Sequence, residues 1–273
     1  MRIVAVGECT RDRYPSLGLE TVGGISLNFA VNSRRSGADV AALVSCVGTD
    51  LGADRIRDKL GREGVDTTAL HVKTGPTASQ LVQLEAGGER IFPVGGYDPG
   101  VLADFRLEAP DLAFIRTFDL VAVPFFRQIE HLFWPAIEAA GPRAKRVVDL
   151  LDGADLGSDL AGVRPMLGRA DLIFLSGAAA VGERLAVLAH GSPTVIVVTH
   201  GANGSSALAG GQWYRMPAAR VPLAERIDTT GCGDAFQAAF AIEFFRAGDV
   251  TTALAIGAEQ ASRAIRHVGA TGE

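Results

Sequence analysis

Cysteine is scarce in this chain, with three residues among 273, at positions 9, 46 and 232. An odd number of scattered cysteines does not form a disulfide framework and is typical of a reducing compartment. None of the five histidines pairs with a cysteine or another histidine at metal-ligand spacing. The sequence therefore predicts neither a disulfide-stabilised secreted domain nor a zinc site.

Long apolar runs and an excess of positive charge are also lacking. Glycine, proline or a charged residue interrupts every apolar stretch before it reaches membrane-spanning length. Residues 1–8 resemble a first β-strand and become charged too soon for a secretory signal. The formal net charge of −5 and the pI near 5.6 disfavour a polyanionic partner. We therefore expect a cytoplasmic protein that binds neither membranes nor nucleic acid.

Short apolar, β-branched runs alternate with helical patterns along most of the chain. Near-continuous apolar strands separated by helices favour a mainly parallel sheet with helices on both faces, an α/β fold. The length allows one large domain, and we expect a single one over residues 1–273. The expected strands are 3–6, 40–47, 120–123, 146–150, 172–175 and 195–199, and the expected helices are 28–36, 52–63, 129–140, 182–190, 232–246 and 251–268.

Two segments, at about 11–22 and 71–97, interrupt this alternation. Both show little helical periodicity, and Gly75-Pro76 and Gly87-Gly88 are turn signals between strand-like runs. We expect them to form a small antiparallel lid inserted into the α/β body. A small isolated sheet exposes its edges and one apolar face, which favours a homodimer through the lid.

The most informative stretch is residues 227–236, Ile-Asp-Thr-Thr-Gly-Cys-Gly-Asp-Ala-Phe. It follows an expected strand at 221–227 and leads into a helix that begins near Cys232. The backbone N–H groups of Gly231, Cys232 and Gly233 would then lie at a helix N-terminus, free to bind an anion. A carboxylate beside such a pocket, Asp234, is best explained as a base for an attacking hydroxyl. The alternative is a cap by Asp228 or Thr230, with Asp234 solvated.

The segment from Asp228 to Asp234 resembles the C-terminal signature of the ribokinase-like (phosphofructokinase B) family of carbohydrate kinases, with Cys232 where alanine is usual. Residues 23–37 resemble the double-glycine signature of that family, and residues 47–52 and 199–204 resemble two further landmarks. The resemblance covers residues 3 to about 270. It implies a three-layer αβα sandwich with a β lid, and ATP, Mg²⁺, a monovalent cation and a sugar as ligands.

The resemblance also implies site residues. Gly23 and Gly24 would admit the sugar ring, and Asp12 and Asn28 would bind the sugar hydroxyls. Thr199, Gly201 and Gly204 would lie against the nucleotide phosphates and ribose, with Ala258 in the purine slot. Each group has a plainer interpretation: a tight turn for the diglycine, a helix surface for Asn28, and a hairpin turn for residues 201–204.

The sequence departs from the family at the metal site. Many members have Asn-x-x-Glu after the strand at 172–175, whereas this chain has Ser176-Gly-Ala-Ala179. Transfer to a hydroxyl still requires divalent charge on the phosphates. Asp149 and Asp152, at the end of another strand, are the candidate metal ligands, and turn or cap chemistry is the alternative.

The substrate is narrowed by residues 99–107 and 117–121, which with Ser176 resemble the fructoselysine 6-kinase branch. That resemblance implies an amine-bearing ketose, for which Glu8, Glu20 and Asp98 are possible counter-charges. Ribose, fructose or a nucleoside fits the motifs as an alternative, as does a catalytically silent sugar or nucleotide sensor. A nicotinamide-dependent dehydrogenase is excluded because no glycine fingerprint follows the first strand.

Overall fold

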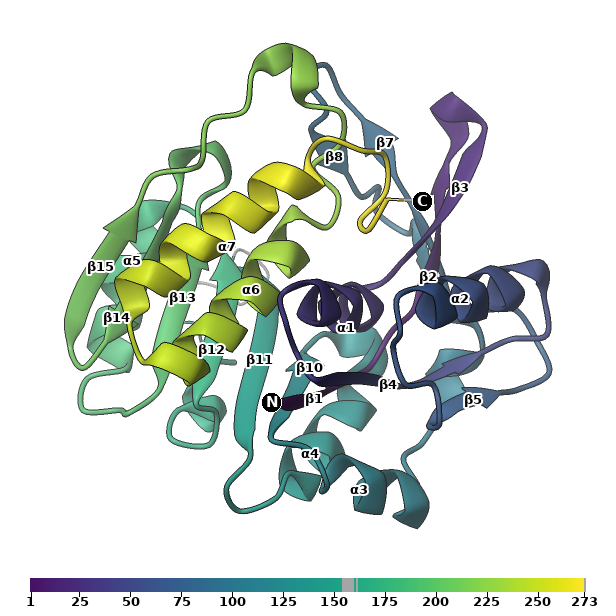
Figure 1. Ribbon diagram of the computed structural model, residues 1–273, viewed down its shortest axis with the longest axis horizontal. Coiled ribbons are helices and arrows are strands. Elements are labelled where there is room, and N and C mark those ends of the chain that lie inside the picture. The colour runs from purple at the N-terminus through teal and green to yellow at the C-terminus, as the bar shows by residue number, and fades with distance from the viewer. Residues whose placement is uncertain (154–159, 161, 273) are drawn as a thin grey trace.

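The computed structural model of the protein describes residues 1–153, 160 and 162–272. A nine-stranded sheet forms its centre, in the order β15-β14-β13-β12-β11-β10-β1-β4-β5 (Figure 1). The pairs β13–β14 and β14–β15 are antiparallel and the other pairs are parallel, so β14 alone runs against the remaining strands. Its strands are β1 (Arg2–Val6), β4 (Val40–Val47), β5 (Leu70–Val72), β10 (Leu120–Pro124), β11 (Lys145–Asp152), β12 (Leu172–Ser176), β13 (Val195–Thr199), β14 (Ser205–Ala209) and β15 (Gln212–Met216).

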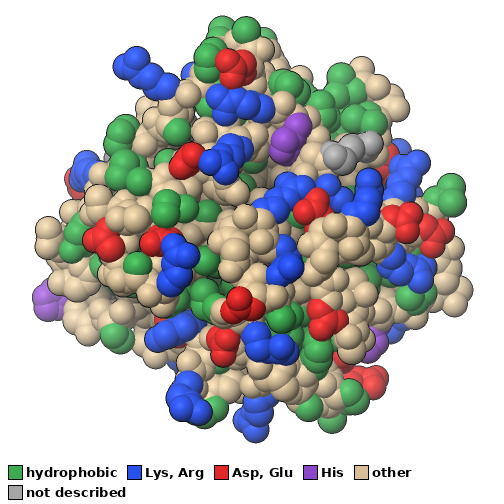
Figure 2. Space-filling model, in the orientation of Figure 1, with side chains coloured by type: hydrophobic (Ala, Val, Ile, Leu, Met, Phe, Trp, Pro, Cys, Tyr) green, Lys and Arg blue, Asp and Glu red, His purple; other side chains and the backbone are tan. Residues whose placement is uncertain are grey.

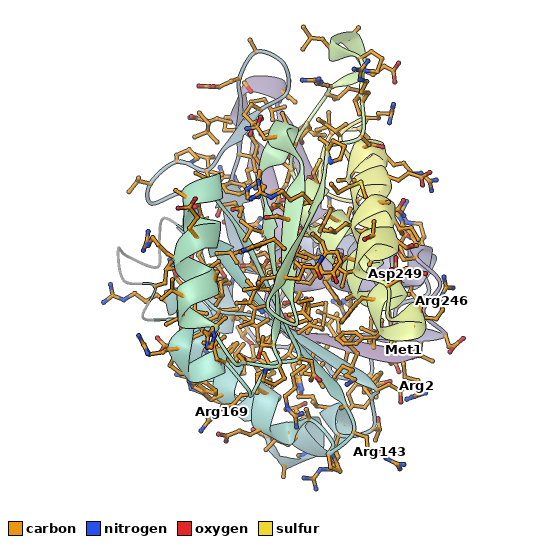
Figure 3. The ribbon with its side chains drawn as sticks, turned by 90° about the vertical axis from the view of Figure 1, so that its left-hand side faces the viewer. Met1, Arg2, Arg143, Arg169, Arg246 and Asp249 are labelled. Atoms are coloured by element: carbon orange, nitrogen blue, oxygen red, sulfur yellow. The ribbon has the colours of Figure 1, made fainter. Side chains whose placement is uncertain are left out.

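Helices cover both faces of this sheet, which gives the three-layer αβα arrangement expected from the sequence (Figure 3). Strand β1 shows why: Val4 and Val6 pack in one core cluster and Ile3 and Ala5 in the other. Strands buried on both faces read as continuous apolar runs. The helices are α1 (Ile25–Arg35), α2 (Leu51–Arg62), α3 (Ala109–Ile115), α4 (Glu130–Ala139), α5 (Ala179–Leu188), α6 (Cys232–Ala247) and α7 (Val250–Ala264).

Local sequence fixes several helix ends. Asp50 accepts a hydrogen bond from the Ala53 amide at 3.0 Å and begins α2, and Asp249 does the same for the Thr252 amide and α7. Gly248 closes α6 in the left-handed conformation. Within the described residues, none of the helices combines the length and apolarity needed to cross a bilayer.

A second, four-stranded sheet stands beside α1 and α2, in the order β3-β2-β6-β9 (Figure 1). Its strands are β2 (Thr10–Tyr14), β3 (Leu19–Gly23), β6 (Ser79–Leu81) and β9 (Tyr97–Asp98). This small sheet is not purely antiparallel, because β2 pairs with β6 in parallel. A separate hairpin joins β7 (Gln83–Leu84) to β8 (Arg90–Ile91).

Two boundaries expected from the sequence are wrong. His71 lies in β5, which pairs in parallel with β4 of the large sheet, so the small sheet begins further along the chain. Residues 221–227 form no strand, and a 3₁₀ turn at Leu223–Glu225 occupies that segment instead. Its apolar residues Leu223 and Ile227 are exposed and belong to no strand pair. The apolar residues of segment 221–227 were therefore not enough to specify that it pairs as a strand.

Candidate active site

The N-terminus of α6 is built without a side-chain cap. Gly231 adopts a left-handed conformation, with φ of 77°, and a Cβ there would lie 2.5 Å from the Ala270 Cα. Asp228 accepts a hydrogen bond from the Thr230 amide at 2.8 Å rather than from the helix, so the capping interpretation is wrong. The Cys232 amide, which the sequence predicted to be free, donates to the Thr229 carbonyl at 3.3 Å. In the described part of the chain, the amides of Gly233 and Asp234 have no such partner.

Asp234 lies in the first turn of α6 and contacts α1 through Asn28, whose Nδ2 donates to Asp234 Oδ2 at 2.7 Å. Burial, together with the charges of Asp149 and Glu8, raises the pKa of Asp234 to about 8, against the Asn28 hydrogen bond and the charge of Arg90. A carboxylate with a pKa near neutrality is suited to accepting a proton from a hydroxyl. The solvated helix-turn interpretation of Asp234 does not fit this environment.

Asp12, Gly23, Gly24 and Asn28 are brought together by the β2–β3 pair and the start of α1. A Cβ at Gly23 would lie 2.0 Å from Asp12 Oδ2, so the missing side chain makes room for that carboxylate. Gly24 has φ of 99°, and a Cβ there would lie 2.8 Å from the Cys9 Cα. Gly24 is therefore required by close backbone approach, and the Asp12 carboxylate fills the space that a side chain at Gly23 would take.

Two further observations show this region to be polar and incompletely satisfied. Burial raises the pKa of Asp12 to about 7, against a hydrogen bond from Thr10 Oγ1 at 2.6 Å. Asn28 Oδ1 is buried and has no hydrogen-bond partner among the described residues. Because buried polar atoms are nearly always paired in folded proteins, this oxygen is free to accept a hydrogen bond from a bound molecule.

Glu8, after β1, is a further buried carboxylate of the group, with 6% of its surface exposed. Its Oε1 accepts from the Ile25 amide at 3.2 Å. Oε2 meets no hydrogen bond of normal geometry among the described residues, and the Tyr97 hydroxyl of β9 lies beside the carboxylate and lowers its pKa against the effect of burial. Burial raises the pKa of Glu8 and that of Tyr97, and the neighbouring Asp149 adds to the shift for Glu8. Across the part of the chain that the structure describes, no cation is among the groups that perturb Glu8.

The two other predicted counter-charges differ from Glu8. Glu20 pairs with Arg55 at 3.3 Å and Arg11 at 3.9 Å, and the exposed Asp98 accepts from the Gly100 amide at 2.9 Å. Their charges are already neutralised by a partner or screened by water. Of the three candidates, Glu8 therefore has the greatest need of a positive ligand.

Asp149 and Asp152 flank a bulge at the end of β11. Leu151 lies between them with φ of 58°, an uncommon conformation for leucine, and its amide donates to Asp149 Oδ1 at 2.9 Å. Burial raises the pKa of Asp149 to about 6, against this bond and one from Gln237 of α6. Asp152 is exposed, beside Ser176 of β12. No cluster of three His, Cys, Asp or Glu side chains suited to a metal occurs within residues 1–153, 160 and 162–272.

Thr199 ends β13, and a 3₁₀ turn, Gly201–Asn203, leads into the antiparallel β14. The hairpin interpretation of residues 201–204 is thus right about the connection. Gly201 and Gly204 have positive φ, and a Cβ at Gly204 would lie 2.2 Å from the Met216 carbonyl, whereas one at Gly201 would meet open space. Ala258 lies on α7 against the core cluster shared by α1 and α6.

Comparison with known proteins defines the family. The family described as pfkB family carbohydrate kinase matches residues 3–123 and 166–273. The chain belongs to the pfkB family of carbohydrate kinases. It is therefore a phosphotransferase that acts on a sugar hydroxyl, and the family resemblance and the fold expected from the sequence are confirmed.

Individual relatives refine this result. The chain is 33% identical to the fructoselysine 6-kinase of Escherichia coli strain K12, over 98% of both chains. It is 28% identical to the fructosamine kinase of Bacillus subtilis strain 168, over 100% of this chain and 93% of the relative. Among solved structures, the adenosine kinase of Sinorhizobium meliloti has a TM-score of 0.84 at 16% identity, covering 98% of this chain and 95% of that one. Arabidopsis thaliana ribokinase, complexed with ribose and ATP, has a TM-score of 0.78 at 20% identity, with coverage of 99% and 94%.

Three residues of this pfkB kinase site were not singled out from the sequence: Arg90, Tyr97 and Gln237. Arg90 lies in β8, and its charge opposes the rise that burial causes in the pKa of both Asp234 and Cys232. Tyr97 comes from the edge of the small sheet, and Gln237 from the second turn of α6. Arg90 and Tyr97 lie in two-residue strands, which show no periodicity or motif in the sequence that would have marked them as site residues. Only the i, i+3 spacing of Asp234 and Gln237 on one helix face could have indicated Gln237.

Proposed function

We propose that the protein transfers the γ-phosphoryl group of ATP to a primary hydroxyl of an amine-bearing ketose of the fructoselysine type. The observation that carries the proposal is the buried carboxylate of Glu8, which has the Tyr97 hydroxyl beside it but no cation among the groups that shift its pKa, in a site that also holds Asp12, Asp149 and Asp234. A protonated amine would pair with the ionised carboxylate and favour that form, whereas a neutral sugar would supply no counter-charge and would leave the neutral acid favoured. The fructoselysine and fructosamine kinases among the relatives support the same substrate class.

The proposed chemistry follows from Asp234 and the start of α6. Asp234 removes the proton of the sugar hydroxyl as its oxygen attacks the γ-phosphorus, and the bond from that phosphorus to the β,γ-bridging oxygen breaks to release ADP. The amides of Gly233 and Asp234, with Gly231 shaping the turn, would stabilise the negative charge on the migrating phosphoryl group. Asn28 holds Asp234 through Nδ2 and would accept a sugar hydroxyl at Oδ1, beside Asp12.

The residues present fit a magnesium ion. Mg²⁺ is usually bound through one or two carboxylates, water and substrate phosphates rather than by a protein cage. Asp149 is buried beside Asp234, and no cation among the described residues shifts its pKa, so it is the proposed ligand. Asp152, on the other side of the same bulge in β11, would be the second ligand. When bound, Mg²⁺ would neutralise charge on the phosphates of ATP. A ribokinase II-type protein from E. coli, with a TM-score of 0.80 and 18% identity, has been solved with ATP and Mg²⁺.

The nucleotide would lie along the turn after β13, with Thr199, Gly201 and Gly204 at the phosphates and ribose and Ala258 near the purine. The open space at Gly201 supports close approach of a ligand. A monovalent cation is a further predicted cofactor. Turnover in K⁺ compared with turnover in tetramethylammonium at equal ionic strength tests that prediction, and equal rates would contradict it.

Steady-state kinetics on fructoselysine, fructose and ribose test the substrate class. Fructoselysine should have the highest kcat/KM of the three. Glu8→Gln should lower kcat/KM for fructoselysine about 10- to 100-fold, because a hydrogen bond to a charged group contributes about 1.5–3 kcal/mol. The same variant should change kcat/KM for fructose by less than about threefold.

Glu20→Gln is the matched control, since Glu20 is already paired with Arg11 and Arg55. It should leave the preference for fructoselysine intact. A clear preference of the wild type for ribose or fructose would refute the amine-bearing substrate and leave the kinase activity standing. If the protein consumed no ATP in the presence of any of the three sugars, the result would instead support a catalytically silent sugar-binding protein.

We also propose a homodimer through the small sheet, in a cytoplasmic location. Leu17, Leu19, Ile91, Phe92 and Val94 are exposed on the small sheet and the β7–β8 hairpin, and Figure 2 shows hydrophobic side chains over the end of the β2–β3 hairpin. The three cysteines are all free, as expected in a reducing compartment. Light scattering after size exclusion should give twice the chain mass, and Leu17→Lys should shift it to the monomer.

A further inference from the structure

Asp228, the first acid of the C-terminal motif, has no part in the chemistry proposed above, yet it is completely buried. Its Oδ2 accepts hydrogen bonds from the Tyr14 hydroxyl at 2.8 Å and the Gly269 amide at 2.9 Å. Its Oδ1 accepts from the Thr230 amide at 2.8 Å. One carboxylate thus joins β2 of the small sheet, the C-terminal segment and the turn that leads into α6.

The same turn is held by the β7–β8 hairpin. The Thr229 amide donates to the Gly88 carbonyl at 2.8 Å, and the Arg90 amide donates to Thr229 Oγ1 at 2.9 Å. Gly231, the next residue but one, contacts Ala270 so closely that a Cβ would not fit. The β2 strand, the β7–β8 hairpin and the C-terminal segment therefore fix the position of the turn at residues 228–231, which precedes the proposed phosphate-binding amides.

The three donors require a carboxylate at position 228. An ionised carboxylate accepts on both oxygens, whereas an amide has one accepting oxygen and one donating NH₂ group. The tyrosine hydroxyl could reverse its role, but the amides of Gly269 and Thr230 can only donate. Asparagine at position 228 would therefore leave one buried backbone N–H facing another donor, which weakens the junction.

We propose that Asp228 is a positioning residue, linked through the Tyr14 hydroxyl to β2, that couples sugar binding at the small sheet to the geometry of the phosphate-binding turn. Asp12 and Tyr14 are two residues apart on β2 and so lie on the same face of that strand. Contact of a sugar with Asp12 would fix β2, and the Tyr14–Asp228 bond would fix the turn before Gly231. This inference rests on the proposed roles of Asp12 and of the α6 amides.

Tyr14→Phe tests the coupling because it removes only the hydroxyl and keeps the buried ring. It should lower kcat about 10- to 100-fold on whichever of fructoselysine, fructose or ribose the wild type turns over, with sugar KM within about threefold. Thr194→Val is the matched control. The Thr194 hydroxyl is also buried, accepting from the Gly168 amide at 2.9 Å and donating to the Ala170 carbonyl at 2.8 Å, away from the site. It should lower Tm without lowering kcat.

Amide hydrogen exchange separates coupling from simple loss of stability. In the protein without ligand, peptides covering residues 228–236 should exchange about tenfold faster in Tyr14→Phe and at the wild-type rate in Thr194→Val. Wild-type kcat together with wild-type exchange in Tyr14→Phe would overturn the inference. If the wild type phosphorylated none of the sugars, the proposed function would fail, and the exchange comparison would still decide whether Tyr14 positions the turn.

Discussion

Carboxylates at the amino ends of the strands of the large sheet differ in environment from those at the carboxyl ends. At the amino ends of the strands, Asp39, Asp119 and Asp171 each directly precede a strand and each have a donor. Asp39 pairs with the N-terminal ammonium, Asp119 accepts from the Arg2 amide at 2.7 Å, and Asp171 accepts from Lys145 at 3.1 Å. At the carboxyl ends, Glu8 and Asp149 are buried and Asp234 is partly buried near them, and desolvation raises the pKa of each.

The amino-end charges are also the more exposed ones. Figure 3 shows Arg2, Arg143 and Arg169 at the end of the molecule away from the small sheet. The pKa of Asp39 is lowered by its hydrogen bond to the N-terminus, the reverse of the shift at Asp234. Exposed carboxylates with a donor hold strand ends in place, whereas carboxylates that burial has desolvated weaken the free protein and are typical of functional sites, where a ligand can compensate their charge.

The largest expected effect is the loss of the base. Asp234→Asn keeps the size of the side chain and removes the proton acceptor, so kcat should fall about 10²- to 10⁴-fold. In the wild type, kcat/KM should rise with pH and level off above an apparent pKa of about 8, because Asp234 must be ionised to act as a base. Asp171→Asn at the opposite end should leave kcat unchanged. Near-normal turnover in folded Asp234→Asn would show that another group is the base.

The two motif glycines should separate activity from stability. A Cβ at Gly233 meets no atom within 4 Å, so Gly233→Ala should fold normally and lower kcat about 10- to 1,000-fold by crowding the phosphoryl group. Gly231→Ala meets Ala270 at 2.5 Å and a positive φ, and should lower Tm as well. Melting curves and kinetics on both variants check this. Full activity in Gly233→Ala would place the anion elsewhere.

The free energy of unfolding of the ligand-free protein should fall as the pH rises, because of the buried acids at the carboxyl ends of the strands. This is the reverse of the usual effect of carboxylates. Burial raises the pKa of Asp149 from its ordinary value of 3.8 to about 6, so between these values the folded state binds more protons than the unfolded state. Its contribution is present in full below about pH 3.8 and is lost as the pH rises through 6. Asp12 and Asp234 extend the window to about 8.

Denaturant titrations from pH 4 to 8 check this slope, which should be on the order of 1 kcal/mol per pH unit for each titrating group. Asp149→Asn should flatten the slope and raise stability at pH 8 while lowering activity. Added Mg²⁺ and ATP should restore stability at high pH by favouring the charged forms. A slope of the opposite sign would mean that the carboxylates are already paired in the free protein.

The smallest effect is expected at the amino end. Lys145→Ala removes a half-exposed ion pair with Asp171, and should lower the free energy of unfolding by no more than about 1 kcal/mol, without changing kcat/KM. The Asp171 carboxylate would still accept from the Arg146 amide at 2.9 Å. An effect on activity would show that the two ends of the sheet are not independent.

The central strands and long helices could be predicted closely from the sequence. Strand β4 has the expected bounds, and α6 begins at Cys232 as expected, because a run buried on both faces and a helix after two glycines carry local signals. Short edges could not be predicted as well. His71 belongs to the large sheet and residues 221–227 to no sheet, since the pairing of a three-residue strand depends on its neighbours.

For the site, the sequence determined the chemical groups: Asp234, the glycines before it, and the acids and Asn28 at strand and helix ends. Only the tertiary structure decided their states, because desolvation and charge act through space. Glu8 and Glu20 are the same residue type, yet one is buried without a counter-charge among the described residues and the other is paired with two arginines. Asp228 likewise reads as a cap in the sequence, and folding makes it the junction of three segments far apart in the chain, since a carboxylate bonds to whichever donors surround it.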